Sequence, residues 1–288
     1  MIGEIVMIEK MKRLSADIRI QTIRAMQSAG FGHIGGSMSI ADVLAVLYGG
    51  VMNIRPEDPQ WAERDYLVLS KGHCGPALYA ALALTGYFPL EQLCTLNQPG
   101  TKLPSHCDRL KTTGIDMSTG SLGQGVSVAA GIALGFKIGG KPNYIYCILG
   151  DGEVQEGQVW EAVEAAVHHK LDRLILFVDE NKKQLDGRVA DICDNQNLAG
   201  KFKEFGCRVQ RVCGYDCGAI YEAVSKAKGG VNSVNVIILD TYKGIGCSFA
   251  ESSEFNHYMV INKEMADEAV RIIEERYADG TYPGGDFV

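Results

Sequence analysis

The chain has 288 residues, of which 46% are hydrophobic and 22% are charged, and its formal net charge is −7. This length is enough for one or two domains with a large core. The acidic balance, together with the lack of a basic stripe in the sequence, argues against a nucleic-acid surface.

The sequence predicts a protein of the cytosol. Its start, MIGEIVMIEK, carries Glu4 and Glu9 within the apolar part and makes a poor signal peptide. The longest nearly apolar stretch, expected at 126–136, is too short to span a bilayer. The nine cysteines form no CxxC, and the CxxxC of Cys213 and Cys217 lacks a second pair at zinc-site spacing. We therefore expect free thiols in a reducing compartment.

The N-terminal half reads as helices around one strand. Helical spacing predicts helices at 7–28, 39–48, 77–84, 90–96 and 126–137, and a β-rich run predicts a strand at 66–69. We expect Ser39 to cap the second helix, with Asp42 near its start. The glycine-rich segment 30–37 and the stretch 97–125 read as loops. A loop as long as 97–125 is more often functional than not.

The most informative stretch is 144–186, in which two apolar runs flank a helical pattern at 159–167. The run 144–149 stops at Gly150-Asp151-Gly152, and the run 174–178 stops at Asp179-Glu180-Asn181. The crossover between them is long enough to make the two strands parallel. Such sheets bind ligands beyond the carboxyl ends of their strands.

The C-terminal part continues the alternation of strands and helices. Residues 187–200 read as loop, and the expected elements are a helix at 201–205, strands at 207–212 and 234–240, and helices at 217–227 and 261–277. No composition shift marks a linker. We predict a single domain over 1–288, built as a doubly wound parallel α/β sheet with helices on both faces and N-terminal helices at roughly 7–48.

Asp151 and Asn181 are candidate metal ligands. Gly152 and Asn181 are separated by 28 residues, 153–180, and each side chain follows a predicted strand. A carboxylate and an amide oxygen suit Mg²⁺ or Ca²⁺, and Mg²⁺ usually completes its shell with phosphate oxygens and water. The glycines allow close approach of a ligand, and the following helix offers free N–H groups to an anion. A lone GDG is most often a turn, but the pairing with Asn181 predicts a metal that bridges to a pyrophosphate.

This motif resembles the one shared by thiamine-diphosphate enzymes, and GDGEVQEGQVWEA with FVDENKKQLDG resembles its transketolase form. Glu180 departs from the pattern, because Asp or Asn is common there. The resemblance implies the thiamine-diphosphate-binding fold, with Asp151, Asn181 and the backbone carbonyl of Lys183 as ligands of Mg²⁺ or Ca²⁺. It also implies that Gly150, Gly152 and Glu153 bind the cofactor.

Three further segments extend the resemblance through most of residues 15–250 in the family's order. GHIGGSMS, LSKGHCGPALY and DMSTGSLGQG resemble the transketolase segments GHPGxxMG, LSxGHxxxxLY and TGPLGQG. A single loop histidine is more often a surface residue than a catalyst. The matching contexts imply that His33, His73 and His106 line the substrate channel and bond the donor's hydroxyls, with His73 also at the cofactor. An ordinary histidine pKa near neutrality suits proton exchange.

The resemblance implies roles for four more residues. The backbone carbonyl of Gly120 would accept a hydrogen bond from the cofactor's 4′-amino group, and Leu122 would hold the cofactor in its bent form. Glu156 would match the family's acidic residue at the subunit contact, although an exposed glutamate at a helix start is an equally ordinary explanation. His257 lies in EFNHY, where relatives commonly have WHG or FHG, and would line the site.

The chain is less than half the length of a complete transketolase. The family's second domain supplies the glutamate at the aminopyrimidine ring, the aromatic pocket around that ring and the arginines for a sugar phosphate. Too few residues follow Asp240 to form such a domain. We therefore expect the N-terminal, diphosphate-binding subunit of a split transketolase, a transferase of two-carbon ketol units from a ketose phosphate to an aldose in carbohydrate metabolism. A separate pyrimidine-binding chain would complete an α2β2 heterotetramer.

Two other interpretations share the same metal motif or fold. Another thiamine-diphosphate carboligase, or the α chain of a 2-oxoacid dehydrogenase, would carry the same Asp151 and Asn181 pair. The histidines favour a donor rich in hydroxyls, such as a ketose. A non-catalytic binding subunit could retain the fold, and the intact motif counts against it.

Overall fold

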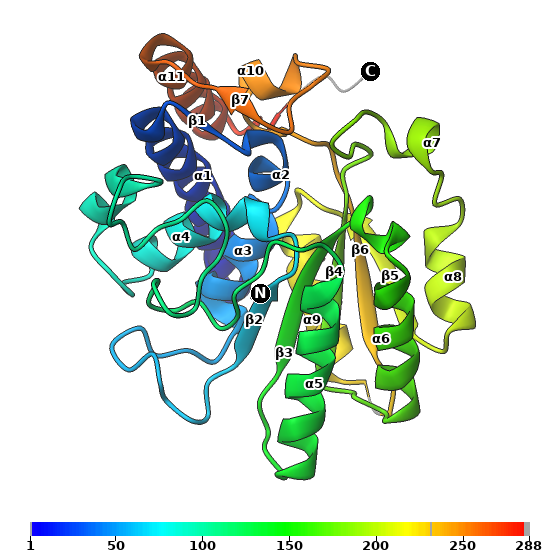
Figure 1. The fold of residues 1–288 in the computed structure, drawn as a ribbon. Coiled ribbons are helices and arrows are strands. Elements are labelled where there is room, and N and C mark those ends of the chain that lie inside the picture. The colour runs from blue at the N-terminus through cyan, green and yellow to red at the C-terminus, as the bar shows by residue number, and fades with distance from the viewer. Residues whose placement is uncertain (1, 231, 285–288) are drawn as a thin grey trace.

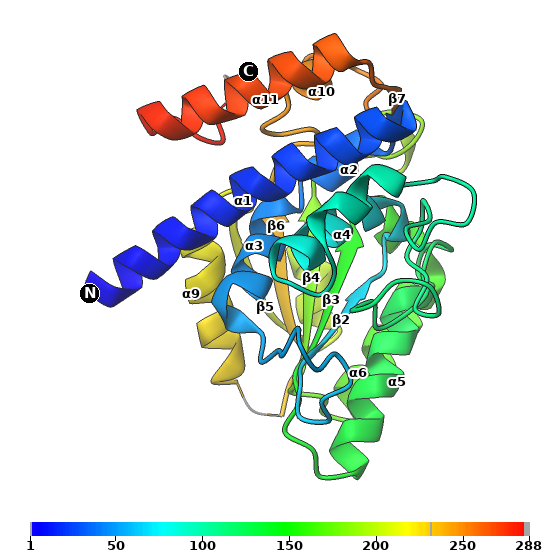
Figure 2. The same cartoon turned by 90° about the vertical axis from the view of Figure 1, so that its left-hand side faces the viewer.

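The computed structural model describes residues 2–230 and 232–284 and shows a central sheet with helices on both faces (Figures 1 and 2). The sheet is parallel, with the strand order β2-β3-β4-β6-β5. Its strands are β2 (Tyr66–Leu69), β3 (Ile145–Gly150), β4 (Leu174–Glu180), β5 (Arg208–Cys213) and β6 (Asn235–Asp240). A small antiparallel sheet pairs β1 (Phe31–Gly32) with β7 (Met259–Val260). The predicted α/β architecture is confirmed.

Helices and short helical turns connect these strands. The α-helices are α1 (Ile2–Ala29), α2 (Ile34–Met38), α3 (Ala41–Val46), α4 (Gly75–Leu84), α5 (Gln124–Ile138), α6 (Gly157–His168), α7 (Val189–Ile192), α8 (Leu198–Glu204), α9 (Cys217–Lys228), α10 (Ser248–Glu251) and α11 (Lys263–Asp279). A π-helical turn η1 (Leu47–Val51) follows α3, and the 3₁₀ turns are η2 (Gly72–Cys74), η3 (Leu90–Thr95) and η4 (Glu153–Gln155).

Alternate residues of the buried strands pack into two separate cores, as expected for a parallel sheet covered on both faces. One core takes Ile148, Phe177 and Ile237 together with side chains of α1, α3, α4 and α9. The other takes Cys147 and Leu176 with side chains of α5, α6 and α8. Figure 2 shows these two helical layers on opposite sides of the strands. Near-continuous apolar runs in β3 and β4 follow from burial on both faces.

The small sheet of β1 and β7 lies near the carboxyl ends of the central strands. In Figure 1, α10, α11 and β7 lie at the top, above the tips of the central strands. Helix α11 packs on α1, and an ion pair joins Arg13 to Glu274. The C-terminal segment therefore returns to the N-terminal helices and closes over the edge of the sheet where the predicted site lies.

Several expected elements need correction. Residues 34–38 form α2 within the expected loop 30–37, and 189–192 form α7 within the loop 187–200. Ser39 does not cap the start of α3, because that helix begins at Ala41 with Ile40 as its N-cap. Ser39 is instead the C-cap of α2, and its hydroxyl donates to Asp179 Oδ2 at 2.7 Å. Strand β4 extends through Asp179 and Glu180, which were expected beyond its end. At Ser39, a buried hydrogen-bonding partner outweighs the local preference of serine for the start of a helix.

One stretch passes the length and hydropathy test for a membrane-spanning helix among the described residues. Ile34–Val51 has a mean hydropathy of 1.5 over 18 residues, and 83% of it is buried inside the fold. The sequence predicts the longest apolar stretch at 126–136 instead, because Asp42 interrupts the stretch 34–51. Burial of this extent is that of core helices, and the segment is broken into α2, α3 and η1.

Candidate active site

A cavity of about 390 Å³ opens at the carboxyl ends of four neighbouring strands, β2, β3, β4 and β6. Every site residue expected from the sequence lines it: His33, His73, His106, Gly120, Leu122, Gly150, Asp151, Gly152, Glu153, Glu156, Asn181, Lys183 and His257. Residues separated by up to 224 positions therefore meet in one place. The cavity also includes Lys71, Gln155, Gln184, Leu185 and Lys243, which sequence reasoning did not single out.

Asp151 lies directly after β3 and is 3% exposed. Its Oδ2 accepts from the backbone N–H of Lys182 at 2.7 Å, and its Oδ1 accepts from that of Gly152 at 2.9 Å. Burial and the neighbouring charge of Asp179 raise the pKa of Asp151 to about 7, although these hydrogen bonds oppose the shift. A buried carboxylate with a raised pKa gains from a cation placed beside it.

Asn181 follows β4 and has its side-chain amide fixed. Its Nδ2 donates to Asp179 Oδ2 at 2.7 Å and to the Ser39 hydroxyl at 3.4 Å. The opposite side of the amide, Oδ1, accepts only a long bond from the Lys183 N–H at 3.2 Å. The donor half of the amide is thus held in the protein interior, and the acceptor half is available to a cation.

The donor set fits a hard divalent cation that brings its own phosphate ligands. No group of three His, Cys, Asp or Glu side chains that could hold a metal occurs within 2–230 and 232–284. A metal would therefore depend on Asp151 Oδ, Asn181 Oδ1 and a backbone carbonyl, with phosphate and water completing its shell. The carbonyl of Lys183 accepts from Lys243 Nζ at 3.1 Å and keeps a second lone pair for a metal.

Two buried lysines bring positive charge to the same cavity. Lys71 forms a buried ion pair with Asp179, whose charge raises the pKa of Lys71 although burial alone would lower it. Lys243 is 6% exposed and donates to the carbonyls of Lys183 and Gln184. Burial, reinforced by the charge of Lys71, lowers the pKa of Lys243 to about 8. Among residues 2–230 and 232–284 the hydrogen-bond acceptors of this ammonium are all neutral, so it is suited to an anionic ligand.

The pairing of β1 with β7 brings two of the histidines together. Gly32 pairs with Met259 in the antiparallel ladder. The next residue on each strand, His33 on one and Tyr258 on the other, therefore lies at the end of this ladder, and the two rings are 5.2 Å apart. The ring of His33 lies 5.3 Å from that of His257 and 5.5 Å from that of His73. The His106 ring is 5.6 Å from the His33 ring, and the His73 and His257 rings are 4.8 Å apart.

The histidine cluster is neutral near physiological pH. Burial lowers the pKa of all four rings, to about 4 for His33 and about 3 for His257. The charge of Lys243 adds to the effect at His33 and His257, and that of Lys71 at His73. Each neutral ring offers one N–H donor and one nitrogen acceptor. The structure therefore indicates a surface that bonds hydroxyl groups, rather than the pKa near neutrality that the sequence suggested.

Glycines shape the wall around this cluster. Gly120 has φ +157°, and a Cβ there would lie 3.0 Å from His106 Cδ2. A Cβ at Gly152 would lie 2.8 Å from Gln184 Cβ. Leu122 and Glu156 are exposed at the cavity edge, whereas Glu153 is 2% exposed and bonded within the protein. The roles expected for the Gly120 carbonyl and the Leu122 side chain at the cofactor remain predictions.

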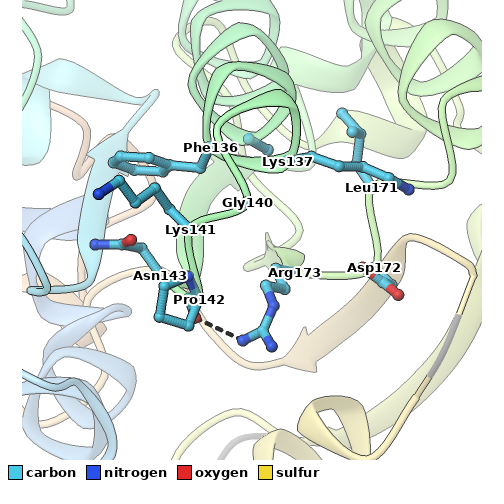
Figure 3. Close-up of a pocket in the computed structure, with 10 residues that line it drawn as sticks. Phe136, Lys137, Gly140, Lys141, Pro142, Asn143, Leu171, Asp172 and Arg173 are labelled. Carbon is cyan, nitrogen blue, oxygen red and sulfur yellow. Dashed lines mark hydrogen bonds between the residues drawn. The ribbon is translucent and has the colours of Figure 1, made fainter.

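A second pocket, of about 290 Å³, lies at the opposite end of the sheet (Figure 3). Two of its basic side chains, those of Lys137 and Arg173, donate to backbone carbonyls. Lys137 Nζ donates to His169 O and Lys170 O at 3.0 and 2.6 Å, and Arg173 donates to Pro142 O at 2.5 Å. Among the described residues no histidine other than His168 and His169, which follow one another at the end of α6, lies outside the first cavity. The polar chemistry is concentrated at the carboxyl edge.

Comparison with known families gives a match over most of the chain. Residues 10–277 match the family "Transketolase, thiamine diphosphate binding domain". The 6-deoxy-6-sulfo-D-fructose transketolase subunit SqwG of Clostridium sp. (strain MSTE9) is 51% identical over 261 residues, which are 91% of this chain and 95% of that protein. An apulose-4-phosphate transketolase subunit of Actinobacillus succinogenes is 37% identical, over 89% of this chain and 91% of that protein.

Solved structures agree with the family match. Transketolase from Campylobacter jejuni superposes with a TM-score of 0.83 and 30% identity, over 96% of this chain and 48% of that chain. The present chain thus spans about half of that solved transketolase and nearly all of the two relatives named as subunits.

Proposed function

The chain belongs to the transketolase family as a thiamine-diphosphate-binding subunit, and from this premise we propose how its residues serve the reaction. The enzyme transfers a two-carbon ketol unit from a ketose to an aldose, and thiamine diphosphate, when bound, supplies the carbanion chemistry. The observation that carries the proposal is the meeting of Asp151, Asn181 and the four histidines in one cavity at the carboxyl edge of the sheet.

Asp151, Asn181 and the Lys183 carbonyl would hold a divalent cation, Mg²⁺ or Ca²⁺, and this cation would bind the diphosphate. The fixed amide of Asn181 and the buried, hydrogen-bonded carboxylate of Asp151 support this assignment. Lys243 would donate to a diphosphate oxygen, because its ammonium faces only carbonyls and a histidine nitrogen within the described structure. Lys71 adds positive charge behind them.

The neutral histidines would bond the hydroxyls of the ketose donor and exchange protons at its carbonyl oxygen. The ring centroids of four neighbouring pairs lie between 4.8 and 5.6 Å apart, so hydroxyls on neighbouring carbons can reach different rings. Each neutral imidazole offers one donor and one acceptor to the donor's hydroxyls, and this avoids the cost of burying a charge. His73 lies beside Lys71 and would contact both cofactor and donor.

A separate chain with the pyrimidine-binding domain would close this cavity, as one half of an α2β2 assembly in the cytoplasm. Apolar side chains at the cavity edge support a partner surface, because Leu122 is 38% exposed and Leu185 is 62% exposed. Phe255 and Tyr258, which flank His257, are 65% and 48% exposed. Two relatives that match over 95% and 91% of their own length carry the word "subunit" in their names.

The donor would be a ketose with an anionic group at its far end. The relative of 51% identity is named for 6-deoxy-6-sulfo-D-fructose, which carries a sulfonate, and the relative of 37% identity for apulose 4-phosphate. A ketose sulfonate is the substrate class that the more similar relative supports. Rates with 6-deoxy-6-sulfo-D-fructose and with fructose 6-phosphate would separate the two chemistries.

The deciding experiment mixes the purified chain with its pyrimidine-binding partner chain, thiamine diphosphate and Mg²⁺, and measures ketol transfer to an aldehyde. Transfer should require both chains and should stop when Mg²⁺ is removed by a chelator. Full activity of this chain alone would refute the divided enzyme. Activity with pyruvate in place of a ketose would favour another carboligase.

A further inference from the structure

Glu153 is a buried carboxylate that hydrogen-bonds to three different loops of the cavity. Its Oε1 accepts from the Ser70 hydroxyl and from the backbone N–H of Gly123 at 2.8 Å, and its Oε2 accepts from the N–H of Gly150 at 3.0 Å. Its side chain is 2% exposed, and no lysine or arginine lies within ion-pair distance in the described structure. Burying a charge is costly, and here three neutral donors, together with the more distant charge of Lys71, compensate this carboxylate.

Each of the three loops carries groups of the proposed site. Ser70 lies at the end of β2, three residues before His73. Gly123 follows Gly120 and Leu122 and starts α5, with φ +81°. Gly150 ends β3 and directly precedes Asp151. One carboxylate thus connects the substrate-channel histidine, the segment expected to contact the aminopyrimidine and the metal ligand.

Glu153 acts together with other contacts between these segments, such as the Thr119 hydroxyl, which donates to Leu69 O at 2.6 Å, and the Ser70 N–H, which donates to Ile148 O at 2.8 Å. A Cβ at Gly125 would lie 2.5 Å from Ser70 Oγ, so the start of α5 lies directly on the β2 loop. The backbone N–H of Gly123 faces Glu153 and has no backbone partner within residues 2–230 and 232–284. Glu153 Oε1 accepts two hydrogen bonds and Oε2 accepts one, so the structure shows this side chain bonded to the segments around the cavity, and its expected contact with the cofactor stays a prediction.

We infer that Glu153 is a positioning residue that holds the His73, Gly120–Leu122 and Asp151 segments in register for cofactor binding. This inference rests on the proposed function, since it concerns the same cavity. A glutamine at this position cannot replace it. Its two terminal atoms would have to meet three donors, and whichever way the amide turned, its NH₂ would face a backbone N–H.

The test compares wild type with Glu153→Gln in the full chain, using calorimetric titration of thiamine diphosphate with Mg²⁺. We expect the dissociation constant to rise by about 10- to 100-fold and amide exchange at Gly123 and Gly150 to accelerate. When the pyrimidine-binding partner chain is added and the cofactor is saturating, kcat should fall by less than about 5-fold, and its pH profile should keep its shape. Glu164→Gln, an exposed change on α6, is the matched control and should leave the dissociation constant unchanged.

Two outcomes would overturn the inference: unchanged affinity and exchange in a folded Glu153→Gln protein, or loss of turnover at saturating cofactor, which would make Glu153 a chemical participant. If Glu153→Gln does not fold, Ser70→Ala serves instead, because it removes one of the three donors to Glu153. This variant should weaken cofactor binding by about 3- to 10-fold. Unchanged affinity in Ser70→Ala would also overturn the inference. Absence of cofactor binding to wild type would contradict the proposed function instead.

Discussion

The two ends of the central sheet carry similar residue types in opposite arrangements. At the amino end, Lys137 and Arg173 donate to backbone carbonyls, and Figure 3 shows the bond from Arg173 to Pro142 O. Asp172 Oδ2 accepts from the backbone N–H of Asn232. At the carboxyl end, Lys71, Asp151 and Asp179 lie within one buried cluster, and within the described residues Asp179 Oδ1 has no hydrogen-bond partner. Charged groups at the amino end therefore bond to backbone groups, whereas at the carboxyl end Lys71 and Asp151 line a cavity.

This difference shows why a count of polar residues does not locate a site. The amino-end pocket is polar and basic, yet its charged groups gain hydrogen bonds that the helix and strand ends need. In the carboxyl-end cavity, burial raises the pKa of Asp151 to about 7 and lowers that of Lys243 to about 8. Opposed shifts of this kind mark functional sites more often than structural ones.

Among the predicted changes, removal of Asp151 should give the largest effect, and it tests the contrast between the two ends of the sheet most directly. Asp151→Ala should abolish the rise in melting temperature that thiamine diphosphate with Mg²⁺ gives to wild type, because affinity falls by more than about 100-fold. Differential scanning fluorimetry with and without the cofactor measures it. Asp172→Ala at the amino end is the control and should keep the full shift. An unchanged shift in Asp151→Ala would favour a scaffold role for the chain.

His73 should matter for turnover more than for cofactor binding. His73→Ala should lower kcat/KM for the ketose donor by about 100-fold, because a neutral ring that donates and accepts at the donor's oxygens is lost. Steady-state rates of the two-chain enzyme measure it. His168→Ala, at the exposed end of α6, offers the same change outside the cavity and should keep wild-type rates. Equal losses in both variants would contradict the assigned channel.

The histidine cluster should make the chain sensitive to acid. The pKa of His33 is lowered to about 4 in the folded chain, against about 6.5 when unfolded. Between these values the unfolded chain binds the proton first, so the free energy of unfolding falls as pH drops from 6.5 towards 4. The slope for one histidine is at most about 1.4 kcal/mol per pH unit, and partial exposure reduces it. Urea titrations at several pH values, with His33→Gln, should show a flatter acid limb for the variant and the wild-type slope for His168→Gln.

Much of the fold could be predicted because it depends on local patterns. The apolar runs at 144–149 and 174–178, the helical spacing between them and the glycines of the turn report burial and backbone freedom directly. The metal pair follows from topology, since parallel strands bring Asp151 and Asn181 to one edge. The residues of the predicted site are accordingly found in one cavity.

The remainder depends on contacts that no local pattern encodes. Strands β1 and β7 have two residues each, too short for a periodic signal, although they bring His33 to His257. Lys71 and Lys243 are 172 positions apart and read as solvated lysines until the sheet is assembled. Ser39 looks like a helix cap, but Asp179, buried 140 positions away, accepts its hydroxyl. In each case a long-range partner decides the role.

The smallest expected effect tests the amino end by itself. Lys137→Ala removes an ammonium that donates to His169 O and Lys170 O, beyond the carboxyl end of α6. An exposed cation at a helix C-terminus contributes about 0.3–1 kcal/mol, so the free energy of unfolding should fall by about that amount in urea titrations. The dissociation constant for thiamine diphosphate should not change, because the lysine serves only backbone carbonyls. A loss of cofactor affinity together with the small loss of stability would mean that α6 transmits strain from one end of the sheet to Asp151, and the two ends would then not be independent.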